Sequence, residues 1–142
     1  MPDKTYKITD AALEQVIVEF CRDITAEAAA GGLKDFARAG NAADAVLQLL
    51  GTGGKKASVY VTAEPGLGAG RVFDAVAQQI VEGVNVPAAL ENARVISPEI
   101  GSMKAGAKFI GQIETRVQTL FQGLAEREGV FQDRRIIVAA ND

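Results

Sequence analysis

Histidine is absent from this chain of 142 residues, and cysteine occurs once. Without histidine there can be no Ser-His-Asp or Cys-His catalytic arrangement, no histidine metal ligand and no imidazole general base. The single Cys21 excludes a disulfide within the chain and a zinc site built from several cysteines. A formal net charge of −3 argues against a nucleic-acid-binding domain, which is normally basic. We therefore predict no metal site and no nucleic-acid partner.

Long apolar runs are also missing from the sequence. No stretch approaches the roughly 20 consecutive apolar residues that a membrane-spanning helix needs. The first seven residues carry charges of both signs and lead into no apolar run, which is not typical of a secretory signal. We expect no membrane association and a cytoplasmic location. The length, with 48% hydrophobic and 23% charged residues, fits one globular domain over 1–142.

The amino-terminal third of the chain has a helical pattern. Apolar residues recur at helical spacing over 9–30, and either Thr9 or Asp10 can cap the first turn. A shorter helix is predicted over 41–50. Residues 8–56 are therefore expected to form an N-terminal helical part.

The rest of the chain alternates between strand and helix patterns. This alternation is typical of βαβ units, in which helices cover a parallel sheet. We predict an α/β fold with a three-layer αβα arrangement, about three parallel strands and a βαβαβ core over 57–142. The expected strands are 59–61, 94–97 and 136–140, and the expected helices are 72–81 and 113–124.

A glycine-rich segment leads into the first helix of this core. It comprises Glu64, Pro65, Gly66, Leu67, Gly68, Ala69 and Gly70. A phosphate-binding loop belongs between a strand and a helix, because backbone N–H groups and the positive end of the helix dipole then face the anion. Such a loop also needs a lysine and a Ser/Thr hydroxyl at its end, where this chain has Ala69 and Gly70. Taken alone, the segment is better explained as a tight strand-to-helix turn.

Four segments, taken in chain order, match the motifs of one protein family. Residues 20–25 are similar to aromatic-x-Arg-Asp-Leu-Thr, and residues 63–68 to Gly-Glu-Pro-Gly-Val-Gly. Residues 77–87 are similar to Ala-Gln-Arg-Ile-x-x-Gly-Asp-Val-Pro, and residues 106–116 to Gly-Ala-Lys-Tyr-Arg-Gly-Glu-Phe-Glu-x-Arg. Their order and nearly constant spacing resemble the first AAA+ module of the Clp-type ATPases, which are ring-forming protein unfoldases and disaggregases. The resemblance implies a partial, truncated AAA+ (P-loop NTPase-like) fold.

The chain departs from this family at three nucleotide-binding elements. Ala69 and Gly70 replace the lysine and Ser/Thr of the Walker A loop, and Asn141-Asp142 stands where the family has the Asp-Glu of Walker B. Residues 34–39 retain nothing of the family's Asp-Pro-Val-Ile-Gly-Arg segment, which flanks the adenine. Losing the lysine removes a charged hydrogen bond worth about 1.5–3 kcal/mol, and losing the metal ligands removes stabilisation of phosphoryl transfer. We therefore expect no catalytic residues and neither ATP nor Mg²⁺ as cofactor, unless the degenerate loop still binds nucleotide.

Lys108, Phe109, Ile110 and Gly111 match the family's pore loop. The resemblance implies that the aromatic residue contacts a polypeptide. The alternative is a buried Phe109 that anchors the next helix. Exposure of its ring would favour the first interpretation.

Two functions of different classes remain open from the sequence. One is a catalytically inactive Clp-like module that serves protein–protein interaction, assembly or regulation. The other is an ATP-binding portion of a Clp-type unfoldase or chaperone, or of a secretion-system Clp ATPase. Because the family adds further strands after the position of Asp142, we also expect a monomer or dimer, with self-association through a sheet edge at 136–140. Cys21 is predicted to lie in the core and to be unreactive.

Overall fold

A computed structural model describes residues 6–31, 42–52 and 69–139 of the chain. Its helices, in chain order, are α1 (Asp10–Phe20), α2 (Ile24–Ala29), α3 (Ala42–Thr52), α4 (Ala69–Glu82), a 3₁₀ helix η2 (Ala88–Leu90), α5 (Ile100–Lys104) and α6 (Ile110–Glu126). Its strands are β1 (Cys21–Asp23), β2 (Arg94–Pro98), β3 (Val130–Phe131) and β4 (Arg134–Val138).

The four strands form one mixed sheet in the order β1-β2-β4-β3. β2 and β4 are parallel, with Arg94 opposite Ile136 and Ile96 opposite Val138. This pair confirms two of the predicted parallel strands, and the predicted strand over 59–61 lies outside the described residues. β1 and β3 run antiparallel to their neighbours and were not predicted. The α/β fold class is as predicted.

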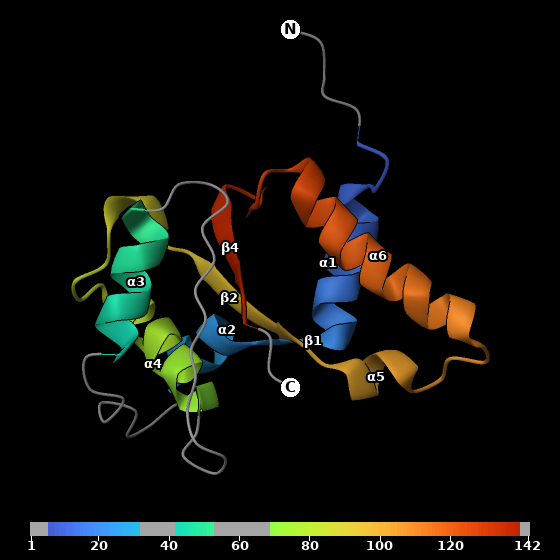
Figure 1. The fold of residues 1–142 in the computed structure, drawn as a ribbon, viewed down its shortest axis with the longest axis horizontal. Helices are drawn as coiled ribbons and strands as arrows, with labels where there is room; N and C mark the ends of the chain where they lie inside the picture. The colour runs from blue at the N-terminus through green and yellow to red at the C-terminus, as the bar shows by residue number, and fades with distance from the viewer. Residues whose placement is uncertain (1–5, 32–41, 53–68, 140–142) are drawn as a thin grey trace, which may run out of the picture.

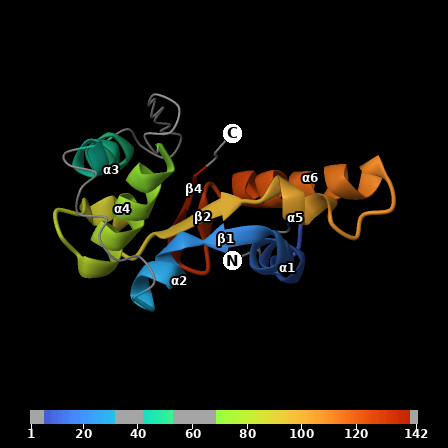
Figure 2. The same cartoon turned by 90° about the horizontal axis from the view of Figure 1, so that it is seen from below.

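Helices cover the sheet on both faces because the side chains of β2 and β4 alternate between them. Val95 and Ile137 face a core formed with α2, α3 and α4, whereas Ile96 and Ile136 face a second core formed with α1, α5 and α6. Figures 1 and 2 show these two groups of helices on opposite sides of the strands. This arrangement is the expected αβα layering.

The prediction of one continuous helix over 9–30 is wrong in its middle. Thr9 caps α1 by accepting a hydrogen bond from the N–H of Ala12, as one of the two proposed caps. The chain then becomes extended at Cys21–Asp23, where it pairs with β2. Asp23 restarts the helix by accepting a hydrogen bond from the N–H of Ala26. Strand pairing and this cap outweigh the helical spacing of the apolar residues, which continues through the break.

The carboxyl end of α6 is clamped to the amino-terminal segment, far away in sequence. The guanidinium of Arg127 is almost fully buried and donates to the carboxylate of Asp10 at 2.6 Å and to the carbonyl of Ile8 at 2.8 Å. Glu126 accepts hydrogen bonds from the backbone N–H groups of Lys7 and Ile8, each at 3.0 Å. We call these contacts the carboxyl clamp. They fix the end of α6 against the start of α1.

β4 lies between β2 and β3 rather than at an edge of the described sheet. β3 pairs with its first two residues, Arg134 and Arg135. The proposed self-association through 136–140 was based on an exposed edge, and the sheet order makes β1 and β3 the outer strands of the described part. That association remains a prediction.

Candidate functional site

Most of the predicted nucleotide site lies outside the described residues. This applies to Glu64–Gly68 of the loop and to Asn141-Asp142, which are therefore known only from the sequence. Ala69 and Gly70 are the first two residues of α4. In Figure 1, α4 begins on the side of the sheet toward which β4 runs, which is where ligands bind in α/β sheets.

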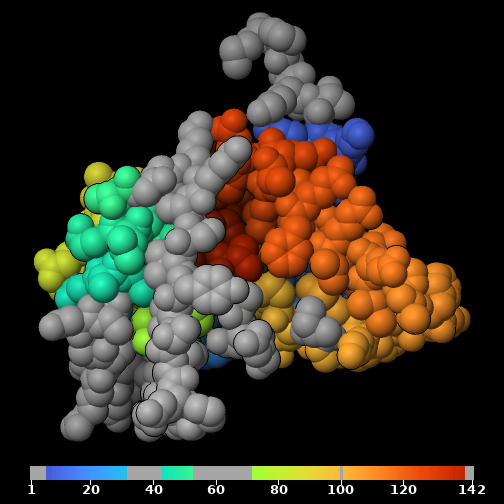
Figure 3. Space-filling view, in the orientation of Figure 1, coloured from blue at the N-terminus to red at the C-terminus, as the bar shows by residue number. Residues whose placement is uncertain are grey.

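The pore-loop-like residues lie at one extremity of the molecule, with Lys108 and Phe109 between α5 and α6 and with Ile110 and Gly111 in the first turn of α6. Phe109 is 62% exposed and Ile110, the first residue of α6, is 72% exposed. Figure 3 shows that α5 and the amino end of α6 form a protruding end of the described surface. The alternative of a buried Phe109 is therefore wrong. We call residues 104–111 the tip.

Arg116, which lies about one and a half turns after the start of α6, holds the tip in place. Its guanidinium donates to the carbonyl of Met103, which is buried, and to that of Ala105 at 3.3 Å. The same guanidinium stacks on the ring of Phe20, 4.5 Å from the ring centre. Three segments thus meet at one side chain: the end of α5, the end of α1 and the body of α6. The sequence included Arg116 in a motif but gave no signal of this role.

Within the tip, local contacts orient Phe109. The side-chain oxygen of Gln112 accepts a hydrogen bond from the backbone N–H of Lys108 at 2.6 Å. The backbone N–H of Gln112 donates to the carbonyl of Phe109 at 3.1 Å. A Cβ at Gly111 would lie 3.3 Å from the ring of Phe109, so glycine leaves room for that ring against the helix backbone. These bonds brace the loop while the ring stays exposed.

The tip carries positive charge. Lys104 and Lys108 are both exposed, and neither takes part in an ion pair or side-chain hydrogen bond with the described part of the chain. The first turn of α6 contains no acidic residue. An exposed aromatic ring, an exposed isoleucine and two ammonium groups without an ion pair among the described residues therefore occupy one protruding end.

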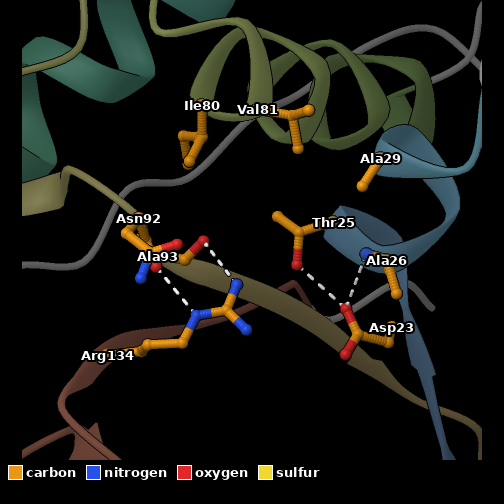
Figure 4. Close-up of a pocket in the computed structure, with 9 residues that line it drawn as sticks. All are labelled: Asp23, Thr25, Ala26, Ala29, Ile80, Val81, Asn92, Ala93 and Arg134. Carbon is orange, nitrogen blue, oxygen red and sulfur yellow. Dashed lines mark hydrogen bonds between the residues drawn. The ribbon is translucent and has the colours of Figure 1, made fainter.

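An open cavity of about 430 Å³ lies at the other ends of the central strands, between α2, α4 and the amino ends of β2 and β4 (Figure 4). The sequence did not predict it. Its polar groups are already used by the fold: Arg134 donates to the carbonyls of Asn92 and Ala93, at 2.9 and 3.5 Å. Asp23 accepts from Thr25 and from the N–H of Ala26, at 2.9 and 3.0 Å.

The carboxylate in this cavity is held in its ionised form. Burial acts to raise the pKa of Asp23, but hydrogen bonds from Ala26, Arg94 and Thr25 outweigh it, so the pKa is lowered. An ionised carboxylate with this many partners is suited to capping α2 and anchoring β2. It is poorly suited to exchanging protons with a substrate.

Cys21 is partly buried beside the core of α1 and α6, as expected of an unreactive thiol. Burial raises its pKa to about 11, so the thiol stays protonated at neutral pH. Within residues 6–31, 42–52 and 69–139, no three His, Cys, Asp or Glu side chains are grouped to hold a metal ion. In the same ranges, no helix combines the length and apolar character needed to span a membrane.

Comparison with known proteins identifies relatives of this chain. No protein-family model matches it. It is 35% identical over 126 residues to Chaperone protein ClpB 1 of Nostoc sp., a match that covers 87% of this chain and 14% of that protein. It is also 35% identical over 119 residues to ClpB 2 of Thermosynechococcus vestitus, covering 84% of this chain and 13% of that protein.

A third relative agrees with these two. Chaperone protein ClpB of Mycobacterium bovis is 30% identical over 128 residues, covering 90% of this chain and 14% of that protein. The chain therefore spans about one seventh of the length of the curated relatives it matches. Over most of its own length it is homologous to these chaperones, and it belongs with the Clp-type AAA+ proteins that its motifs resemble.

Proposed function

We propose that this chain is a catalytically inactive Clp-like module that binds a protein partner through the tip. The observation that carries the proposal is the exposure of Phe109 and Ile110 on a loop braced by Arg116. A large apolar side chain on a protruding loop costs solvation free energy unless a partner covers it. The relatives are named chaperone proteins, and that name fits a surface that contacts other polypeptides.

The proposed lack of ATPase activity is supported by the sequence. Alanine at 69 and glycine at 70 supply neither the charge nor the hydroxyl that phosphate and Mg²⁺ need, and Asn141 is a weaker metal ligand than aspartate. The competing proposal, an ATP-binding portion of a Clp-type chaperone, is favoured by the retained Glu64–Gly68 motif. Nucleotide binding distinguishes the two.

Calorimetric titration with Mg·ATP tests this distinction. We expect no measurable binding by the natural chain and no phosphate release. The matched control is the double substitution Ala69→Lys/Gly70→Thr, which restores both missing groups. If the loop keeps its shape, the variant gains nucleotide binding, which would attribute the loss to those two side chains. Micromolar affinity in the natural chain would contradict the proposal.

Protein binding by the tip is tested separately with a fluorescently labelled, unstructured peptide containing apolar residues. Fluorescence anisotropy should show binding to the natural chain and little binding to Phe109→Ser/Ile110→Ser. Because both side chains are exposed, the variant should stay folded, which circular dichroism checks. Equal binding by the two proteins would place the contact elsewhere.

A further inference from the structure

The apolar stripe of α6 extends beyond the helix that covers it. Alternating steps of three and four residues separate the members of this stripe, as in a helix packed along one seam: Ile110, Ile113, Val117, Leu120 and Leu124. Leu120 and Leu124 are buried in the core that α6 shares with α1. Ile110 is almost fully outside that core.

Ile110 is exposed because α1, the helix that packs against α6, is short. α1 ends at Phe20, where the guanidinium of Arg116 stacks on its ring. The guanidinium of Arg116 thus reaches the end of α1. Between residues 110 and 119 of α6, no side chain is fully buried. The tip therefore presents the start of an apolar seam, together with Phe109, to whatever lies beyond the described fold.

Charge indicates which kind of segment could cover this seam. Lys104 and Lys108 precede Phe109 and Ile110 within the tip, and they have no ion-pair or side-chain hydrogen-bond partner in the described part of the chain. The carboxylate of Glu114 lies one turn further along α6, so the lysines outnumber it. A second copy that docked the same surface would bring lysines against lysines, and a basic segment would meet the same repulsion.

We propose that the tip binds extended polypeptide segments in which apolar residues are flanked by aspartate or glutamate. The apolar residues would cover Phe109 and Ile110, while the carboxylates would pair with Lys104 and Lys108. This proposal rests on the proposed function, in which the tip is a protein-binding loop, and adds the chemical class of the segment bound.

Three labelled peptides with the same apolar residues test the proposal. Their flanking positions carry glutamate, serine or lysine. At low ionic strength we expect affinity to fall from the acidic to the neutral to the basic peptide, with about tenfold between the extremes if two exposed charge pairs contribute. High salt should reduce that difference, because screening weakens exposed charge pairs.

Charge-reversed variants provide the matched comparison. Lys104→Glu/Lys108→Glu should reverse the order of the acidic and basic peptides. Lys7→Glu changes an exposed lysine near the opposite end of α6, about 25 Å away for a 17-residue helix, and should preserve the order. Circular dichroism confirms that each variant is folded.

The outcomes separate this proposal from the one it rests on. If all three peptides bind equally, the acidic preference is wrong and the protein-binding role stands. If none binds, both are wrong. Tighter binding to phosphatidylserine vesicles than to the acidic peptide would also overturn the proposal, since the tip would then be a membrane contact.

Discussion

The two halves of α6 have the same apolar spacing but different surroundings. The carboxyl half buries Leu120 and Leu124 against α1 and ends in the carboxyl clamp around Arg127. The amino half, from Ile110 to Thr119, has no fully buried side chain and ends in the exposed tip. Because a helix is continuously hydrogen-bonded, the packed half can hold the projecting half in position. Under the proposed function, stability and partner binding belong to opposite ends of α6.

Truncation of one apolar side chain in each half tests this division most strongly. Leu120→Ala should lower the free energy of unfolding by about 3 kcal/mol, because it opens a cavity at a fully buried position. Ile113→Ala, at a half-exposed position, should cost about 1 kcal/mol or less. Urea titrations measure both. Equal losses would show that the amino half is packed as tightly as the carboxyl half.

The two arginines of α6 provide a second, smaller contrast. Arg127→Met should cost about 2 kcal/mol, because the buried carbonyl of Gly123 and the partly buried carbonyl of Ile8 lose a charged donor. Arg116→Met removes the bonds to Met103 and Ala105 at a more exposed site, so we expect a loss of about 1 kcal/mol or less.

For peptide affinity, we expect the larger loss in the Arg116 variant and not in the Arg127 variant. Arg116→Met should weaken binding at the tip by loosening its base, whereas Arg127→Met should leave the affinity of the folded protein unchanged. Anisotropy titrations under strongly native conditions measure this. A loss of affinity in Arg127→Met that matches the loss in Arg116→Met would mean that the two ends are coupled.

The smallest expected effect in α6 is a pH dependence at the carboxyl clamp. The pKa of Glu126 is lowered, chiefly by the hydrogen bond from the N–H of Ile8. A carboxylate with a lowered pKa in the folded state stabilises above its ordinary pKa, and this contribution is lost as the pH falls through the lowered value. Acid should therefore loosen the clamp.

Urea midpoints measured from about pH 7 to about pH 3 should fall less steeply for Glu126→Gln than for the natural chain. The variant should also be less stable at neutral pH. Glu114→Gln, in the exposed amino half, is the control and should follow the natural profile. If the urea midpoint of the Glu114 variant fell less steeply with pH instead, the acid sensitivity would lie in the amino half of α6 and the prediction would be wrong.

Much of the framework could be predicted from the sequence. The parallel pairing of β2 with β4 follows from two short apolar runs separated by a helical pattern, and the cap at Thr9 follows from its side chain. β1 could not be predicted, because Cys21–Asp23 lies within a helical repeat and becomes a strand only by pairing with β2. The carboxyl clamp joins residues 117 to 119 positions apart, a separation that no local pattern records.

The candidate site was likewise predicted only in part from the sequence. The motif at Lys108–Gly111 identified the tip, but a phenylalanine before a helix is equally compatible with a buried anchor. Only the lengths and placement of α1 and α6 decided that Phe109 is exposed. The nucleotide elements at 64–68 and 141–142 lie outside the described residues, so their loss of function remains a prediction from side-chain chemistry.

The missing histidine and the scarce cysteine determined by themselves that this chain lacks imidazole and disulfide chemistry, because a side chain that is absent can supply neither. The residues at 69 and 70 determined that a Walker A lysine and hydroxyl are absent, and the loss of ATPase activity remains a prediction. Side-chain spacing likewise determined the apolar stripe of α6. The tertiary structure decided where that stripe is covered, because burial depends on where a partner helix ends, and α1 ends at Phe20. It thereby left Phe109 and Ile110 exposed on a tip that also carries two lysines.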